Sequence, residues 1–369
     1  MDGRERFSVI IRMKKIYYMW ITYTIIFVVL LILELVYFKV ADKCNIIDKP
    51  NERSSHSTIV LRGGGVIFAI SMVIWFIMEL VQGVQGVQEY IPFMGGLILI
   101  AGVSFWDDVK SLPDRIRLVA QFLAMGLAAW GMIQGSELMA LDWYWLVLIG
   151  IAALIVFVGA TNIINFMDGI NGITAGYALA VLVPLMMLDV RGQMDDVAGF
   201  IEPSYLIVAI IGVLVFCLFN FRPKGKAKCF AGDVGSIGIA FIMLFAIGKL
   251  IVQTGDVTYL ILLLVYGVDG CLTIIHRIML HENLGEAHRK HAFQLMANEL
   301  KIGHVKVTLL YMAMQLVVSL GFIYLIPNTV AAHWMYFICA ILVLAVAYVL
   351  FKKKYYYLHE EYLASLRKQ

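Results

Sequence analysis

The sequence is poor in charged residues. Only 15% of its 369 residues are Asp, Glu, Lys or Arg, whereas 62% are apolar. Soluble domains average about 25% charged and 45–50% apolar residues, so this composition excludes an ordinary soluble domain. The stretches between the apolar runs are also too short to hold a soluble domain of their own. We therefore predict an integral membrane protein.

Cysteine is scarce, and no cysteine motif is present. The five cysteines are Cys44, Cys217, Cys229, Cys271 and Cys339, and none of them stands at a metal-binding or redox spacing. The HExxH pattern of zinc hydrolases is missing as well. We expect free thiols and no zinc centre built on cysteine.

The apolar runs lack the two-residue alternation of membrane β-strands, which favours helices over a barrel. Runs of about 17–22 residues recur along the chain, a length that lets a helix cross roughly 30 Å of hydrocarbon. We predict an all-α polytopic protein with about eleven transmembrane helices in a single domain, residues 1–369. The runs cover 18–38, 66–81, 91–106, 117–134, 143–161, 174–188, 204–220, 234–252, 258–279, 307–326 and 333–351, of which the second, third and sixth are short.

Lys and Arg are nearly missing from every second gap between these runs. The even-numbered gaps hold only Arg191, whereas most odd-numbered gaps and the tail at 352–369 are basic. Because basic loops stay in the cytoplasm, we expect the odd gaps and the C-terminus to be cytoplasmic and the N-terminus to lie outside. Five basic residues among the first fifteen oppose this orientation but are outweighed by the other segments.

Four polar islands interrupt the apolar runs, at residues 105–108, 162–169, 231–236 and 288–291. The predicted topology places all of them at the cytoplasmic face. Ionisable groups at membrane depth are costly and usually functional. We therefore predict an active site where these islands converge at that face.

The first island ends in Asp107 and Asp108. Neighbouring helical positions point about 100° apart, so the two carboxylates cannot both face one ion on an intact helix. We expect one to bind a metal or a substrate cation while the other pairs with Lys or Arg. An ordinary polar cap is the alternative.

The second island places Asn162, Asn165 and Asp168 three residues apart, which puts them on one helix face. Amide and carboxylate oxygens suit Mg²⁺. Hydrogen bonding between helices by buried amides is the alternative.

The third island, Gly232-Asp233-Val234-Gly235-Ser236, opens the eighth run. Asp233 could cap that helix, or it could hold a metal that bridges to a phosphate at the helix N-terminus. In the fourth island, His288, Arg289 and His291 suit a pyrophosphate clamp. Zinc binding and attraction to anionic lipid are the alternatives there.

Taken in order, the motifs resemble the polyprenyl-phosphate N-acetylhexosamine-1-phosphate transferases of the MraY/WecA superfamily, glycosyltransferase family 4, over residues 45–305. The motifs are the loop from Asp48 through Pro50, Asn51, Arg53 and His56 to Gly63-Gly64, the Asp107-Asp108 pair, Asn-x-x-Asn-x-x-Asp-Gly, Gly-Asp-x-Gly-Ser and a late His-rich loop. The late loop is closer to the WbpL-like branch than to the consecutive histidines of MraY. Asn171 stands where many members have a second Asp.

The resemblance implies that a lipid phosphate attacks the sugar-linked phosphorus of a UDP-amino sugar and that UMP leaves. The implied partners are undecaprenyl phosphate, the UDP-amino sugar and membrane lipid, with no nucleic acid, and a homodimer is compatible with the resemblance. The implied cofactor is Mg²⁺, with Mn²⁺ as an alternative. The implied location is the inner membrane of a bacterium, where the reaction would start the synthesis of O-antigen, capsule or another cell-envelope glycan.

The resemblance also assigns roles to residues. The implied metal ligands are Asn165 and Asp233. The implied catalytic residues are Asp107, Asp108, Asp168, His288, Arg289 and His291. The implied substrate-binding residues are Asn51, Arg53, His56, Asn162, Asn171, Gly235 and Ser236.

Two other classes of protein compete with this interpretation. A multi-span transporter or lipid flippase would need ionisable groups near the middle of the membrane, and Glu34, Lys249 and Asp269 are the main residues that fall there. A glycosyltransferase with lipid-linked donors would need a carboxylate motif in an outer loop. Asp195 and Asp196 lie in one, but that loop has a solvated composition.

Overall fold

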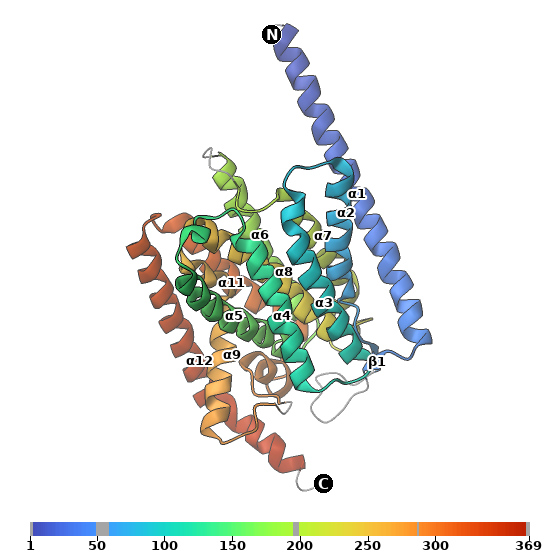
Figure 1. Ribbon diagram of the computed structural model, residues 1–369. Helices are drawn as coiled ribbons and strands as arrows, with labels where there is room; N and C mark the ends of the chain where they lie inside the picture. The colour runs from blue at the N-terminus through green and yellow to red at the C-terminus, as the bar shows by residue number, and fades with distance from the viewer. Residues whose placement is uncertain (1–2, 49–58, 195–198, 286–287, 367–369) are drawn as a thin grey trace.

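The computed structural model describes residues 3–48, 59–194, 199–285 and 288–366. Within them the fold is all-α apart from one short hairpin, as predicted (Figure 1). The hairpin pairs β1 (Ile47–Asp48) with β2 (Val60–Leu61). The α-helices are α1 (Gly3–Lys43), α2 (Val66–Gln82), α3 (Ile91–Val109), α4 (Asp114–Ile133), α5 (Trp143–Phe166), α6 (Ile173–Met194), α7 (Pro203–Asn220), α8 (Gly232–Thr254), α9 (Leu264–Met279), α10 (Ala292–Gln294), α11 (His304–Leu325) and α12 (Val330–Leu366). Four short helical segments complete the fold: η1 (Val87–Tyr90), η2 (Glu137–Ala140), η3 (Val257–Leu263) and η4 (Leu295–Glu299).

Ten helices in the described residues are long and apolar enough to cross a membrane. They correspond to ten of the eleven predicted runs. The run at 66–81 is α2, which has 17 residues and is shorter than the others. The polytopic membrane architecture is therefore confirmed, with α2 as the one short apolar helix.

Helix α8 is the centre of the bundle. Its apolar stretch is 89% buried inside the protein, and it packs against α2, α3, α4, α5 and α6. Its first turn lies very close to the start of α2, because a Cβ atom on Gly235 would approach the Cα of Gly65 to 2.6 Å. Small residues allow such close backbone contact between membrane helices. The third island is therefore packed against Gly65, which follows the Gly63-Gly64 pair at the end of the loop before α2.

The loops that carry the islands meet at one end of the bundle. Leu61 forms a β-bridge with Cys229, which joins the hairpin to the loop before α8. A Cβ atom on Gly169 would approach the ring of Phe293 to 3.1 Å, which joins the loop after α5 to the late His loop. The convergence that we predicted from topology is present, whereas the side of the membrane on which it lies stays a prediction.

The two ends of the chain lie at opposite ends of the bundle (Figure 1). Helix α12 continues to Leu366 as one helix of 37 residues, past the predicted span at 333–351. The segment predicted as a basic tail is thus largely helical. It packs on the late His loop, where Lys352 donates a hydrogen bond to the backbone oxygen of Lys290 and His359 lies 3.1 Å from Glu299.

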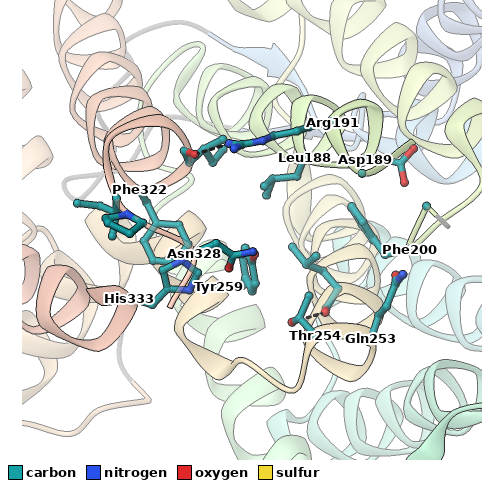
Figure 2. A pocket seen from close by; sticks show the side chains of 16 residues that line it. Leu188, Asp189, Arg191, Phe200, Gln253, Thr254, Tyr259, Phe322, Asn328 and His333 are labelled. Carbon is teal, nitrogen blue, oxygen red and sulfur yellow. Dashed lines mark hydrogen bonds between the residues drawn. The ribbon is translucent and has the colours of Figure 1, made fainter. Parts of the chain in front are cut away.

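A cavity of about 350 Å³ opens at the other end of α8 (Figure 2). Its lining comes from the last turns of α6, α8 and α11, from η3 and from the segments that precede α7 and open α12, with Arg191, Gln253 and Asn328 among the polar residues. One polar contact there is the hydrogen bond from Arg191 to the backbone oxygen of Ile323, at 2.8 Å. The cavity is therefore separated from the island loops by the length of α8.

Candidate active site

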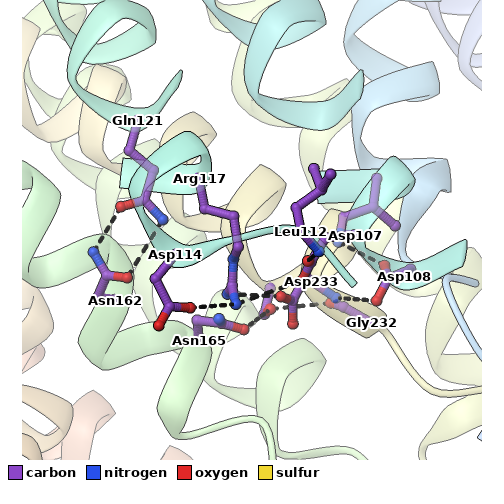
Figure 3. Close-up of polar contacts among 12 residues, drawn as sticks. Asp107, Asp108, Leu112, Asp114, Arg117, Gln121, Asn162, Asn165, Gly232 and Asp233 are labelled. Atoms are coloured by element: carbon purple, nitrogen blue, oxygen red, sulfur yellow. Dashed lines mark hydrogen bonds and ion pairs between the residues drawn. The ribbon is translucent and has the colours of Figure 1, made fainter. Parts of the chain in front are cut away.

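Three carboxylates and Arg117 meet where α3 ends and where α4 and α8 begin (Figure 3). Arg62, which follows β2, is the second arginine of this cluster. Arg62 Nε lies 2.7 Å from Asp108 Oδ1, and its Nη2 lies 3.8 Å from Asp233 Oδ1. Arg117 Nη2 lies 2.8 Å from Asp233 Oδ2, and its Nη1 lies 3.5 Å from Asp107 Oδ2. Three carboxylates against two guanidinium groups leave these five side chains with one excess negative charge, which favours a further cation.

Asp108 holds the first turn of α8. Its two carboxylate oxygens accept hydrogen bonds from the backbone N–H groups of Asp233 and Val234, both at 2.9 Å, and its side chain is fully buried. Gly232 has φ +70° there, and a Cβ atom on it would lie 2.5 Å from Asp108 Oδ2. The helix cap that we considered for Asp233 is therefore supplied by Asp108, from a different helix.

Because Asp108 satisfies these N–H groups, the carboxylate of Asp233 is directed to the two arginines. It keeps 15% of its side chain exposed, whereas that of Asp108 is fully buried. Asp107 has a further partner outside the cluster, because its Oδ1 accepts a hydrogen bond from the N–H of Leu112 at 2.6 Å while its Oδ2 faces Arg117. The two neighbouring carboxylates thus have separate partners, and each also pairs with an arginine.

The asparagine stripe on α5 faces two different helices (Figure 3). Asn165 Oδ1 accepts a hydrogen bond from Ser236 Oγ at 2.7 Å, which ties it to the first turn of α8. Asn162 exchanges hydrogen bonds with Gln121 of α4, at 2.7 and 3.3 Å. The amide of Asn162 therefore joins two helices, as in the alternative interpretation, and Asn165 lies beside the carboxylate cluster.

Asp168 lies in the turn after α5 and accepts a hydrogen bond from Thr174 Oγ1 at 2.5 Å. Burial raises the pKa of Asp168 to about 6, against the lowering effect of that hydrogen bond. Asn171 donates from Nδ2 to the backbone oxygens of Arg222 and Pro223, both at 3.0 Å. Asn171 therefore anchors the loop between α7 and α8.

The late His loop is held by contacts that the sequence did not reveal. His291 Nδ1 lies 3.2 Å from Asp269 Oδ1, and the ring centroids of His288 and His291 are 4.9 Å apart. Burial is the main cause that lowers the pKa of His288 to about 3, so His288 is a neutral imidazole. Its ring lies 6.5 Å from that of Phe166 at the end of α5.

Arg289 lies apart from the carboxylate cluster. Its Nη2 is 3.2 Å from Glu299 Oε1, and its guanidinium carbon is 4.4 Å from the centre of the Tyr362 ring. These contacts join the loop to η4 and to the last turns of α12. Asn51, Arg53 and His56 lie outside the described residues.

Three residues of the site were not selected from the sequence. We used Arg62 and Arg117 only as loop charges for topology, yet both pair with the carboxylates. Asp269 was noted only as a charge within an apolar run. Its buried position among apolar residues was a usable signal, because ionisable groups in membrane helices are usually functional.

Within the part of the chain that the structure describes, no group of three or more His, Cys, Asp or Glu side chains is arranged to hold a metal ion. Mg²⁺ seldom needs such a cage, because it keeps several waters and is commonly held by one or two carboxylates together with substrate phosphates. The partly exposed carboxylate of Asp233 and the amide of Asn165 supply oxygen ligands of the required kind. These residues fit a Mg²⁺ ion that is completed by water and phosphate.

Comparison with known proteins gives a family match. The profile described as Glycosyl transferase family 4 matches residues 90–252, which run from η1 through α8 and include both Asp107 and Asp233. The resemblance to this family that we predicted from the motifs is thereby confirmed.

Three relatives illustrate the similarity. The chain is 26% identical to a "Probable undecaprenyl-phosphate N-acetylglucosaminyl 1-phosphate transferase" of Bacillus subtilis, over 69% of this chain and 70% of the relative. It is 28% identical to a "Phospho-N-acetylmuramoyl-pentapeptide-transferase" of Thermotoga maritima, over 50% of this chain and 59% of the relative. It is also 28% identical to an "Undecaprenyl-phosphate alpha-N-acetylglucosaminyl 1-phosphate transferase" of Escherichia coli K12, over 56% of each. The match thus spans less than two thirds of the length of the last two relatives.

Proposed function

We propose that this protein transfers an N-acetylhexosamine-1-phosphate from its UDP-sugar to undecaprenyl phosphate. An oxygen of the lipid phosphate attacks the sugar-linked phosphorus, the bond from that phosphorus to the UMP oxygen breaks, and undecaprenyl-diphosphate-sugar and UMP are formed. The relatives named above carry names of this reaction class. The transferred sugar is GlcNAc or a 6-deoxy amino sugar, and the product starts a cell-envelope glycan such as O-antigen or capsule.

The observation that carries the proposal is the cluster of Asp107, Asp108 and Asp233 with Arg62 and Arg117 at one end of the bundle. Both substrates are anionic, so their approach requires positive charge near the reacting phosphorus. Arg62 and Arg117 are already paired with three carboxylates, so the cluster would draw a further cation to this position. A site at the membrane edge also suits one lipid and one soluble substrate, and we place it on the cytoplasmic side of a bacterial plasma membrane.

Mg²⁺, held by Asp233 and Asn165, would offset the phosphate charges and polarise the phosphoryl oxygens. The chain's own residues position the substrates. Asp108 fixes the first turn of α8, which carries Asp233, and Arg117 holds that carboxylate at 2.8 Å. In phosphoryl transfer, positioning and charge stabilisation account for most of the rate.

A strong general base is not required for this reaction. The second pKa of a phosphate monoester is near 6, so the lipid phosphate is already largely dianionic at neutral pH. We therefore assign Asp107 and Asp108 to orientation of the site rather than to essential proton removal. Asp108 in particular is occupied by two backbone N–H groups and by Arg62.

The test is UMP release by the purified full-length chain in detergent with Mg²⁺, undecaprenyl phosphate and a panel of UDP-N-acetylhexosamines. We expect release with at least one sugar and loss of release when EDTA removes the metal. Folded protein that releases no UMP with any sugar in the panel would refute the proposal. The sugar that supports release also identifies the donor.

A further inference from the structure

Asp269 is a carboxylate inside α9, with 4% of its side chain exposed, and it accepts several hydrogen bonds. Its Oδ2 accepts from the hydroxyl of Tyr311 at 2.6 Å, and its Oδ1 accepts from the N–H of Ala292 at 3.1 Å. Thr273 Oγ1 also donates to Oδ1, at 3.2 Å. Donors that surround a carboxyl group in this way favour its ionised form, because an ionised carboxylate offers acceptors on both oxygens and has no proton to place against them.

His291 faces this carboxylate. Its Nδ1 lies 3.2 Å from Asp269 Oδ1, and 1% of its side chain is exposed. An ionised carboxylate can only accept, so the proton between them belongs to Nδ1. Nδ1 also lies against the backbone N–H of Gln294, which closes the capping box of α10. If Nδ1 accepted from that N–H, its lone pair would face the carboxylate of Asp269 at 3.2 Å, so the charged acceptor decides the tautomer and the capping bond of Gln294 is weakened.

The second ring nitrogen of His291 is the atom left for a ligand. Nε2 is buried and has no hydrogen-bond partner among the described residues. A buried polar atom of this kind is costly unless something pairs with it. The loop that carries it packs on the end of α5, next to Asp168, since a Cβ atom on Gly169 would approach the ring of Phe293 to 3.1 Å.

We propose that Asp269 is a positioning residue that holds the proton of His291 on Nδ1, so that Nε2 is presented to a phosphate oxygen of the substrates. In this tautomer Nε2 is an acceptor, so it takes up a proton supplied by the solvent before it can donate to a phosphate oxygen. The negative charge of Asp269 offsets the positive charge of the resulting imidazolium, whose Nε2–H then forms a charge-assisted hydrogen bond to the pyrophosphate. This inference rests on the proposed function for the identity of the ligand. The arrangement of Asp269 and His291 is independent of it.

The first test is the protonation of the His291 ring in the full-length protein, measured by ¹⁵N NMR after labelling of histidine, with His291→Asn to assign the signals. We expect Nδ1 of His291 to carry a proton without any ligand, and this proton to be lost or shared with Nε2 in Asp269→Asn. An unprotonated Nδ1 in the unmutated chain would overturn the inference, whether or not the protein releases UMP.

The second test is a double-mutant cycle on UMP release. Carboxylates that orient a metal-bound histidine are typically worth about 10- to 100-fold, and we expect a loss of kcat of the same order for Asp269→Asn, because it orients a histidine in the same way. Because Asp269 acts through His291, the double variant with His291→Asn should be no slower than His291→Asn alone. The positioning role would be refuted if Asp269→Asn lowered kcat in the His291→Asn background as much as it does in the unmutated chain. It would also be refuted if Asp269→Asn alone turned over as fast as the unmutated chain.

Tyr311→Phe is the matched control in this cycle. It removes the hydrogen bond to the other carboxylate oxygen and leaves the contact between Asp269 and His291 in place. We expect its Nδ1 signal to stay protonated. If the chain lacks UMP release altogether, the proposed function fails, and the NMR result still decides the role of Asp269.

Discussion

Asp108 and Asp233 have different tasks although each is an aspartate at the end of a membrane helix. Asp108 is buried and binds two N–H groups of α8, whereas Asp233 is partly exposed and is directed to Arg62 and Arg117. A carboxylate that accepts backbone hydrogen bonds at a helix N-terminus stabilises that helix. We therefore assign helix stabilisation to Asp108 and substrate or metal contact to Asp233.

A stability measurement can test the environment of Asp168. Its pKa rises from 3.8 to about 6 because of burial, so the folded state binds this proton more tightly than the unfolded state does. The protonated side chain of Asp168 therefore contributes to the free energy of unfolding fully below about pH 4. This contribution, about 3 kcal/mol at most, is lost as the pH rises through about 6.

We expect the melting temperature of the unmutated chain to fall between pH 4 and pH 6 relative to that of Asp168→Asn. Differential scanning fluorimetry in detergent across this range measures the difference. If the melting temperatures of the two proteins changed with pH in parallel, burial would not raise the pKa of Asp168.

At the scale of elements, the contact between α2 and α8 sets the geometry of the site. Gly65 and Gly235 allow the first turns of these helices to meet, and Gly64 donates its backbone N–H to the oxygen of Phe230 at 2.9 Å. The motif Gly-Asp-x-Gly-Ser identified the island from the sequence. The sequence did not show that this island packs against Gly65 at the start of α2, because contacts between helix ends depend on packing between segments far apart in the chain.

Gly235→Ala tests this contact. The added Cβ atom would meet the Cα of Gly65 at 2.6 Å, and overpacking of this kind costs about 1–3 kcal/mol. We expect a lower melting temperature and a lower rate of UMP release. Gly238→Ala, on the same helix with no atom within 4 Å of the new Cβ, is the control and should be neutral or slightly stabilising. Equal behaviour of the two variants would contradict the close contact.

At the scale of the whole molecule, the sequence predicted the class of fold and the common end of the island loops. Apolar runs and basic gaps are local properties, so they were readable without a structure. The contact of Asp108 with α8 spans 125 residues of chain, and that of Asp269 with His291 spans 22. Such contacts depend on which helices become neighbours, and no local pattern specifies that.

The predicted orientation can be tested with single cysteines in a chain whose five native cysteines are replaced by serine. Glu137→Cys lies between α4 and α5, and Lys224→Cys lies between α7 and α8, both at exposed positions. With a membrane-impermeant maleimide on intact cells, we expect Glu137→Cys to react and Lys224→Cys to react only after permeabilisation. The reverse pattern would place the carboxylate cluster on the outer face.

The most direct test of the account compares UMP release by Asp233→Asn and Asp114→Asn. Both residues pair with Arg117, at 2.8 and 3.6 Å, but the side chain of Asp114 is 83% exposed and that of Asp233 is 15% exposed. We expect Asp233→Asn to lose at least about 100-fold in kcat, as when a preorganised group at the reacting centre is removed, while Asp114→Asn stays within about twofold of the unmutated chain. Unchanged turnover by well-folded Asp233→Asn would contradict the claim that this cluster is the active site.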